Sequence, residues 1–355
     1  MDLRRTIKDW MLPIAMVTGA SLYLIYHAMP APVHRMGPFL SSLAGILQPF
    51  LIFMMLFLTF CRIEPRDLKP HRWHWWLLLI QGGLFTVLGG AAWCLLRFLP
   101  EGSHYLVVLV ESAMLCLICP TATAAAVVTR KLGGDMPGIT TYIVLINVLV
   151  SLLVPLVVPL IQTSSSTDFW TAFSMILSKV FPLLIAPCFC AWTVRYIFPS
   201  LHRWLMNFPD LAFYLWSVGL TLAIAVTTKS IVHSKAGAGL LLGMSVVSLI
   251  CCAFQFAMGR FVGSRYRPKT SPRTSFGRGD RGASRGRGDK DAAVLRGREV
   301  RKVTAGQSLG QKNTIFAIWM GYTFMTPETA IVGGLYSIWH NLYNSWQLYR
   351  AGKAS

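Results

Sequence analysis

Residues 119–129 read CPTATAAAVVT and lie in the middle of an apolar segment long enough to cross a membrane. A proline within a membrane helix has no N–H to donate, so it frees a backbone carbonyl, and the threonines after it can hydrogen-bond locally. Further along the chain, residues 305–314 read AGQSLGQKNT, which puts two glycines and a run of polar side chains inside another apolar segment. Such side chains are costly in lipid unless they face protein or water. Both segments are therefore predicted to be interrupted helices.

The composition of the whole chain is that of a polytopic helical membrane protein. Of its 355 residues, 54% are hydrophobic and only 13% are charged, against about 25% charged residues in soluble domains. Because about 20 apolar residues cross the hydrocarbon core, ten spans are expected. They lie near Trp10–His27, Phe39–Cys61, His74–Leu96, Tyr105–Thr129, Met136–Ile161, Trp170–Phe198, Phe208–Thr228, Ala236–Val262, Val303–Met325 and Thr329–Tyr349. The first could be a signal peptide, but it is long for one and many similar segments follow.

The basic residues give these ten spans an orientation. Of the 33 Lys and Arg, 27 fall in terminal and loop segments on one side, including 14 between Arg260 and Lys302; four fall on the other side and two within spans. Lys and Arg concentrate in cytoplasmic loops, so a multi-pass protein with both termini cytoplasmic is predicted, by default in the plasma (cell inner) membrane. The net charge of +19 therefore requires no specific nucleic-acid partner.

The two interrupted segments are the fourth and the ninth, which is the same position in each half of five spans. Since five is odd, the second half enters the membrane in the opposite sense. We expect an all-α fold of two inverted five-helix repeats whose broken fourth and ninth helices cross near the midplane. The expected boundaries are 1–162 for the first repeat, 163–263 for helices six to eight, 264–302 for a basic cytoplasmic loop, and 303–355 for helices nine and ten. A proline kink beside a merely amphipathic helix is the alternative.

The basic loop is rich in Gly and Ser and holds two copies of Gly-Arg-Gly-Asp, at residues 277–280 and 286–289. It has few apolar residues to bury, so it is predicted to be disordered. It is either a solvated linker or a contact for anionic lipid or RNA.

Three motifs resemble the bile acid:sodium symporter family. The segment Cys119–Asp135, CPTATAAAVVTRKLGGD, is similar to the family's first crossover motif, and Ser308–Ala317, SLGQKNTIFA, to its second. Ser337–Asn341, SIWHN, matches the Trp-His-Asn of its last helix, and Gln81 matches a third-span glutamine near sodium. The resemblance covers the ten-span core. It implies alternating-access transport of an organic anion, such as a carboxylate or a bile-acid-like or steroid-like solute.

The chain departs from this family where the resemblance implies sodium ligands. Ala125, Ala126, Ser308 and Lys312 stand where the family has oxygen-bearing side chains, including a glutamate. Hard cations need oxygen ligands. We therefore hypothesise that the Lys312 ammonium replaces the cation and that transport is independent of sodium. Alternatively, Lys312 extends to the cytoplasmic surface. No cofactor is expected, sodium being suggested by the resemblance alone.

The candidate solute site combines both interruptions with the third-span glutamine and the last-helix pair. Its residues are Gln81, Pro120, Thr121, Thr123, Gln307, Ser308, Gln311, Lys312, Asn313, His340 and Asn341. Glu111 and Lys179 lie deep in the fourth and sixth spans, where charges pair or line a pathway. They are coupling candidates, as an ion pair or with Glu111 carrying protons. Cys116 and Cys119 have CxxC spacing, but no matching ligand pair follows, so no metal site is predicted.

The sequence has no nucleophile–base pair, metal-ligand set or phosphate loop, so an enzyme is not expected. The leading hypothesis is a secondary transporter of a small organic anion. A non-transporting receptor or scaffold on the same fold is one alternative, and a proton-coupled exchanger is another. Flux into vesicles separates the first two, and dependence on a pH gradient identifies the third.

Overall fold

The computed structural model describes residues 3–98, 104–161, 168–208, 210–234, 237–266 and 287–354. Apart from one isolated bridge, every element in these ranges is a helix. In chain order they are α1 (Leu3–Ala28), α2 (Ala31–His34), α3 (Gly37–Cys61), the 3-10 turn η1 (Pro65–Asp67), α4 (Arg72–Phe98), α5 (His104–Ile118), α6 (Ala124–Lys131), α7 (Met136–Ile161), α8 (Phe169–Ile197), α9 (Pro199–Met206), α10 (Leu211–His233), α11 (Ala238–Arg265), α12 (Arg287–Gly310), α13 (Thr314–Phe324) and α14 (Pro327–Ala354).

By length and composition, six of the described segments can cross a membrane. They are Pro32–Cys61, Arg72–Phe98, Met136–Ile161, Phe169–Ile197, Leu211–His233 and Ala238–Arg265. Two shorter apolar helices, α5 and α13, accompany them. Large apolar side chains such as Phe39 and Leu242 are more than 60% exposed, which suits lipid and is unfavourable in water. The described chain is therefore all-helical and polytopic, as predicted.

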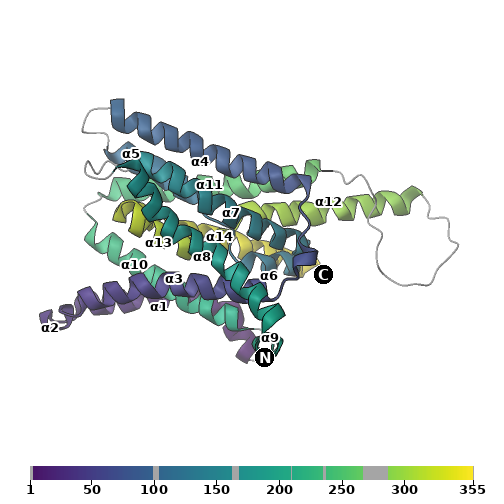
Figure 1. Ribbon diagram of the computed structural model, residues 1–355, viewed down its shortest axis with the longest axis horizontal. Helices are drawn as coiled ribbons and strands as arrows, with labels where there is room; N and C mark the ends of the chain where they lie inside the picture. The colour runs from purple at the N-terminus through teal and green to yellow at the C-terminus, as the bar shows by residue number, and fades with distance from the viewer. Residues whose placement is uncertain are drawn as a thin grey trace.

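The helices pack in two groups, and Figure 1 shows α1, α3 and α10 of the first group along the lower side of the bundle. One group consists of α1, α3, α8 and α10, where α1 and α3 both pack on α10 and α3 also packs on α8. The other consists of α4, α5, α7, α11, α12, α13 and α14. Contacts of α7 with α8, of α3 and α10 with α13, and of α10 with α14 join the groups. The interrupted helices therefore lie beside the boundary between the two groups.

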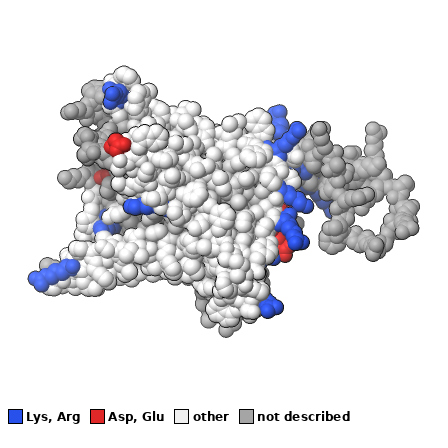
Figure 2. Space-filling view, in the orientation of Figure 1, with Lys and Arg blue, Asp and Glu red and all other residues white. Residues whose placement is uncertain are grey.

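Both termini lie at one end of the bundle, together with α6 and α9 (Figure 1). Lys and Arg side chains gather at this end, whereas fewer are seen at the opposite end (Figure 2). This is the end that the sequence predicts to be cytoplasmic.

The structure differs from the predicted disorder over part of the basic segment. α12 begins at Arg287, so residues 287–302 are helical, while residues 267–286 lie outside the described ranges. Close packing on α11 supports the last part of this helical stretch: a Cβ added at Gly263 would lie 2.4 Å from the carbonyl oxygen of Arg301. An ion pair between Lys302 and Glu299, three residues apart, adds local support. Composition alone does not reveal this long-range contact.

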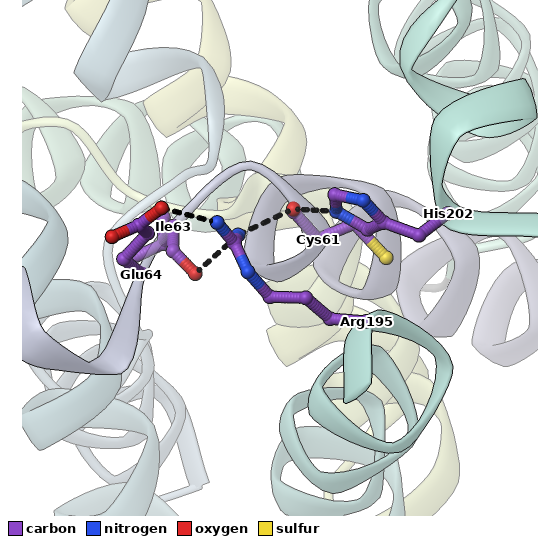
Figure 3. Close-up of polar contacts among 5 residues, drawn as sticks. All are labelled: Cys61, Ile63, Glu64, Arg195 and His202. Atoms are coloured by element: carbon purple, nitrogen blue, oxygen red, sulfur yellow. Dashed lines mark hydrogen bonds and ion pairs between the residues drawn. The ribbon is translucent and has the colours of Figure 1, made fainter. Parts of the chain in front are cut away.

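Side chains from α8 and α9 hold the last turn of α3 (Figure 3). The Arg195 guanidinium donates to the carbonyls of Cys61 and Ile63, both at 3.3 Å, and forms an ion pair of 2.6 Å with Glu64. His202 Nε2 donates to the Cys61 carbonyl at 2.8 Å. The last carbonyls of a helix have no partner within it. The cluster therefore fixes α3 to α8 and α9 at this end.

We expect Arg195→Ala to destabilise the protein by about 1–3 kcal/mol, because the partly buried Ile63 carbonyl loses the guanidinium donor and the Cys61 carbonyl keeps only His202. Glu64→Gln should cost less than about 1 kcal/mol, because exposed ion pairs contribute little; the Glu64 side chain is 54% exposed. Thermal unfolding of the purified variants, followed by tryptophan fluorescence, measures both. Equal losses would mean that the ion pair, and not the carbonyl contacts, holds the cluster.

Candidate functional site

Both predicted interruptions are confirmed by the helix boundaries. α5 ends at Ile118 and α6 begins at Ala124, whereas α12 ends at Gly310 and α13 begins at Thr314. The alternative of a simple kink is wrong, because the chain leaves the helical path at both places.

The two breaks lie against each other. Thr121 and Lys312 form an antiparallel bridge. Beside it, the N–H of Ala122 donates to the Gln311 carbonyl at 2.9 Å. Backbone groups that lose their helical partners are thus satisfied across the break, as a polar backbone within a membrane requires.

The last four backbone carbonyls before Pro120 all accept hydrogen bonds from buried side chains. The donors are Gln255 to Cys116 (3.2 Å), Lys312 to Leu117 (3.1 Å), and Gln81 to Ile118 and Cys119 (3.1 Å each). Pro120 has no N–H to complete the helical bond to Cys116. Side chains from α4, α11 and the second break therefore complete the end of α5.

Among the residues at the crossover, Lys312 is the least typical of a membrane interior, because its side chain ends in an amine. Its side chain is 1% exposed, and its Nζ donates to the Leu117 carbonyl. The alternative in which this amine extends to the surface is wrong. The amine lies at the carboxyl end of α5, where the helix dipole is negative. Within the described ranges, no ion pair joins it to a carboxylate.

Other predicted residues stabilise the crossover. Thr121 Oγ1 donates to the Ser308 carbonyl at 2.5 Å, and the Asn313 N–H donates to the Pro120 carbonyl at 2.8 Å. The Asn313 side chain accepts from the N–H of Phe316 at 3.2 Å and so caps α13. The Ser308 hydroxyl is buried, with no hydrogen-bond partner among the described residues.

A small cavity opens beside the crossover, at the N-terminal ends of α6 and α13. Its volume is about 10 Å³, roughly the space of one water. Five predicted site residues line it together with residues that were not predicted. The lining is Thr123, Gln311, Lys312, Asn313 and His340, with Met55, Ala122, Trp216 and Thr314. Met55 belongs to α3 and Trp216 to α10, so the cavity lies between the two helix groups.

Gln81, Gln307 and Asn341 do not line this cavity. Gln81 donates to the end of α5, and Gln307 Nε2 donates to Asn344 and Gln347 of α14, at 3.0 and 2.7 Å. Asn341 donates to a hydroxyl one turn earlier in its own helix, α14, at 3.3 Å. Gln81 and Gln307 therefore support the site by joining helices.

The two coupling candidates lie near the turn between α13 and α14. The Thr329 hydroxyl donates to Glu111 at 2.9 Å, and Lys179 Nζ lies 5.7 Å from the ring centroid of Phe324. Neither Glu111 nor Lys179 lines the cavity at the crossover.

Two glutamine–tyrosine pairs were missed at the sequence level. Tyr142 donates to Gln81 at 3.0 Å, and Gln255 donates to Tyr336 at 3.1 Å. Tyr336 in turn donates to the Gly310 carbonyl, the last of α12, at 2.7 Å. In the predicted two-repeat arrangement, Gln255 lies in the span equivalent to that of Gln81, and this correspondence is a signal for the second pair. Met55 and Trp216 carry no such signal, because apolar residues fill every span.

The sequence matches the model of the Sodium Bile acid symporter family over residues 49–234. This match covers just over half of the 355 residues, from within α3 to the loop after α10. It includes the first interruption and ends before the second. A comparison with curated proteins found no match.

Proposed function

We propose that this chain, which belongs to the Sodium Bile acid symporter family, is a secondary transporter that carries a small organic anion by alternating access. One observation carries the proposal: the buried Lys312 lies where two broken helices meet and lines a cavity between two helix groups. Polar backbone at membrane depth is tolerated where protein or a cavity surrounds it, and such breaks form transporter sites.

The chemistry of the cavity favours an anion with an apolar body. The N-terminal ends of α6 and α13, near Thr123 and Asn313, carry partial positive charge, and the Lys312 ammonium adds to it. Met55 and Trp216 form an apolar wall on the opposite side. We propose a carboxylate or a steroid-like anion whose charged group lies at the crossover.

We further propose ten spans in two inverted repeats. The first would contain α1, α3, α4, α5 with α6, and α7; the second, α8, α10, α11, α12 with α13, and α14. Matching contacts support this. The first helix of each half packs on the second helix of the other half, as α1 does on α10 and α8 does on α3. The third helix of each half packs on the fifth helix of its own half, as α4 does on α7 and α11 does on α14. The pairs Gln81–Tyr142 and Gln255–Tyr336 occupy equivalent helices of the two halves.

Movement between the two helix groups is the proposed route to alternating access. A cavity of about 10 Å³ holds roughly one water, so a solute can enter only when α3 and α10 separate from the crossover. Opening toward one end and then toward the other would expose the same residues to each side in turn.

We propose that the basic end faces the cytoplasm and that the protein lies in the cell inner membrane. The gathering of Lys and Arg at the end that holds both termini supports this orientation. Basic side chains at this end would also contact anionic headgroups.

Transport is expected to be independent of sodium, because Lys312 contacts the end of α5 and the equivalent ligand positions lack a carboxylate. A thermal-shift screen of organic anions, with and without sodium, would find ligands of the purified protein. Uptake of radiolabelled taurocholate into proteoliposomes would then be measured in sodium and in potassium. Equal rates are expected. A strong requirement for sodium would contradict the role of Lys312, and binding of anions without any uptake would favour a receptor.

A further inference from the structure

We propose that the Lys312 amine is the coupling-ion site of this protein and that the ion it binds and releases in each cycle is a proton. The inference rests on the proposed function and deepens it. It assigns both the ion and the atom that carries it, Nζ of Lys312.

The charge balance around Lys312 supports a proton that can leave. An ammonium has three N–H donors, and burying it is costly unless hydrogen bonds and a counter-charge compensate. The Leu117 carbonyl accepts one hydrogen bond, at 3.1 Å. The carboxyl end of α5 supplies about half of an elementary negative charge. Because no carboxylate of a described residue pairs with Lys312, the remaining compensation must come from elsewhere.

A bound anion would supply this missing charge. Lys312, Thr123 and Asn313 line the same cavity, and the Lys312 side chain leads from that lining to the Leu117 carbonyl, so an anion at the two helix N-termini would lie about one lysine side chain away from the amine. Protonation of Lys312 and binding of the anion would then stabilise each other, and by linkage the two couplings must be equal. Without an anion, the neutral amine is favoured by its burial.

The other titratable groups around Lys312 cannot replace this counter-charge. They are Cys116 on α5, Cys119 directly after it, Cys251 on α11, and Tyr336 and His340 on α14. Thiols, phenols and imidazoles are ordinarily neutral or cationic at neutral pH, unlike carboxylates. Thr123, directly before α6, and Thr314, the first residue of α13, also line the cavity, and their hydroxyl groups do not titrate near neutral pH.

The cycle balances in atoms and charge. On one side of the membrane the amine takes a proton from hydronium, which leaves water, and an anion binds beside the new ammonium. After the cavity opens to the other side, the anion departs and the ammonium returns its proton to water. Each cycle carries one proton with one monovalent anion, so it moves no net charge.

The first test needs no solute. Thermal stability of wild type and Lys312→Met would be measured between about pH 5 and pH 9, a range in which a buried amine can titrate. The difference between the two melting temperatures is expected to change with pH, because only wild type exchanges a proton at this position. A difference that stays constant across this range would overturn the proposal.

The second test uses radiolabelled taurocholate, a sulfonate that stays ionised, so that a pH gradient does not act on the probe itself. In proteoliposomes with the voltage clamped, an inward proton gradient is expected to drive accumulation by wild type. Lys312→Arg should exchange taurocholate without accumulating it, because a guanidinium does not release its proton. Loss of accumulation in His340→Gln, with accumulation kept in Lys312→Arg, would place the proton site at His340 instead.

The outcomes separate this inference from the proposed function. The proton site would be overturned if uptake by wild type did not respond to the proton gradient, or if Lys312→Arg still accumulated taurocholate. If no taurocholate enters, and the melting temperatures still show the titration of Lys312, then the proton site stands and the proposed transport of this class of anion fails.

Discussion

Replacing Gly259 of α11 with alanine is expected to destabilise the protein, although alanine favours a helix over glycine by about 1 kcal/mol. A Cβ at this position would lie 2.3 Å from the carbonyl oxygen of Ala305 and 2.9 Å from the Cα of Gly306. These are backbone atoms of α12, so they cannot move without displacing the helix. Overpacking of this kind costs about 1–3 kcal/mol, and more for a larger side chain.

Gly239, on the same helix, provides the matched control. A Cβ there would meet nothing within 4 Å, so Gly239→Ala should be neutral or stabilising. Heating the detergent-purified variants and measuring the monodisperse fraction by size exclusion would compare them. Gly259→Leu is expected to prevent recovery of folded protein, whereas Gly239→Leu is expected to be tolerated. Equal behaviour at both positions would show that α11 and α12 are not in close contact.

Combining Ser308→Glu with Lys312→Gln is expected to create a response to sodium that the wild-type protein lacks. The double variant removes an ammonium and adds a carboxylate beside carbonyls at the crossover, which is the oxygen-rich, negative environment that a hard cation needs. Binding of an ion to the folded state raises stability as its concentration rises above its dissociation constant. The melting temperature of the double variant should therefore rise in sodium chloride relative to potassium chloride, whereas that of wild type should not.

The single variant Ser308→Glu is the control for this experiment. Its new carboxylate would lie near the Lys312 ammonium, since Thr121 bonds to the Ser308 carbonyl and forms a bridge with Lys312. An internal ion pair would form and sodium would have no effect. Sodium stabilising wild type, or a folded double variant that ignores sodium, would contradict the idea that Lys312 stands in for the cation.

The sequence predicted the interruptions because their signals are local. Pro120 removes a donor, and the polar residues before Asn313 are too costly to face lipid. The depth of Lys312 followed from its position in the span. Its acceptor did not, because a backbone carbonyl such as that of Leu117 has no signature in sequence. Trp216 was not predicted for a similar reason, because its contact with the crossover depends on how the two helix groups pack.

The extent of α12 shows where composition fails to predict secondary structure. Residues 287–302 have the polar, charged composition of a disordered segment, and they nevertheless form part of a helix whose later residues pack on α11. The glycines at 259 and 263 permit this contact by letting two backbones approach. Ala305 and Gly306 of α12 also lie at the contact, but they come after the charged stretch, so the composition of residues 287–302 does not show it.

Every peptide oxygen in the last turn of α5 is occupied by an amide or amine from the same chain. The chain itself therefore supplies the groups that close this junction. If transport is independent of sodium, as proposed, the cell would not have to maintain a sodium gradient for this protein.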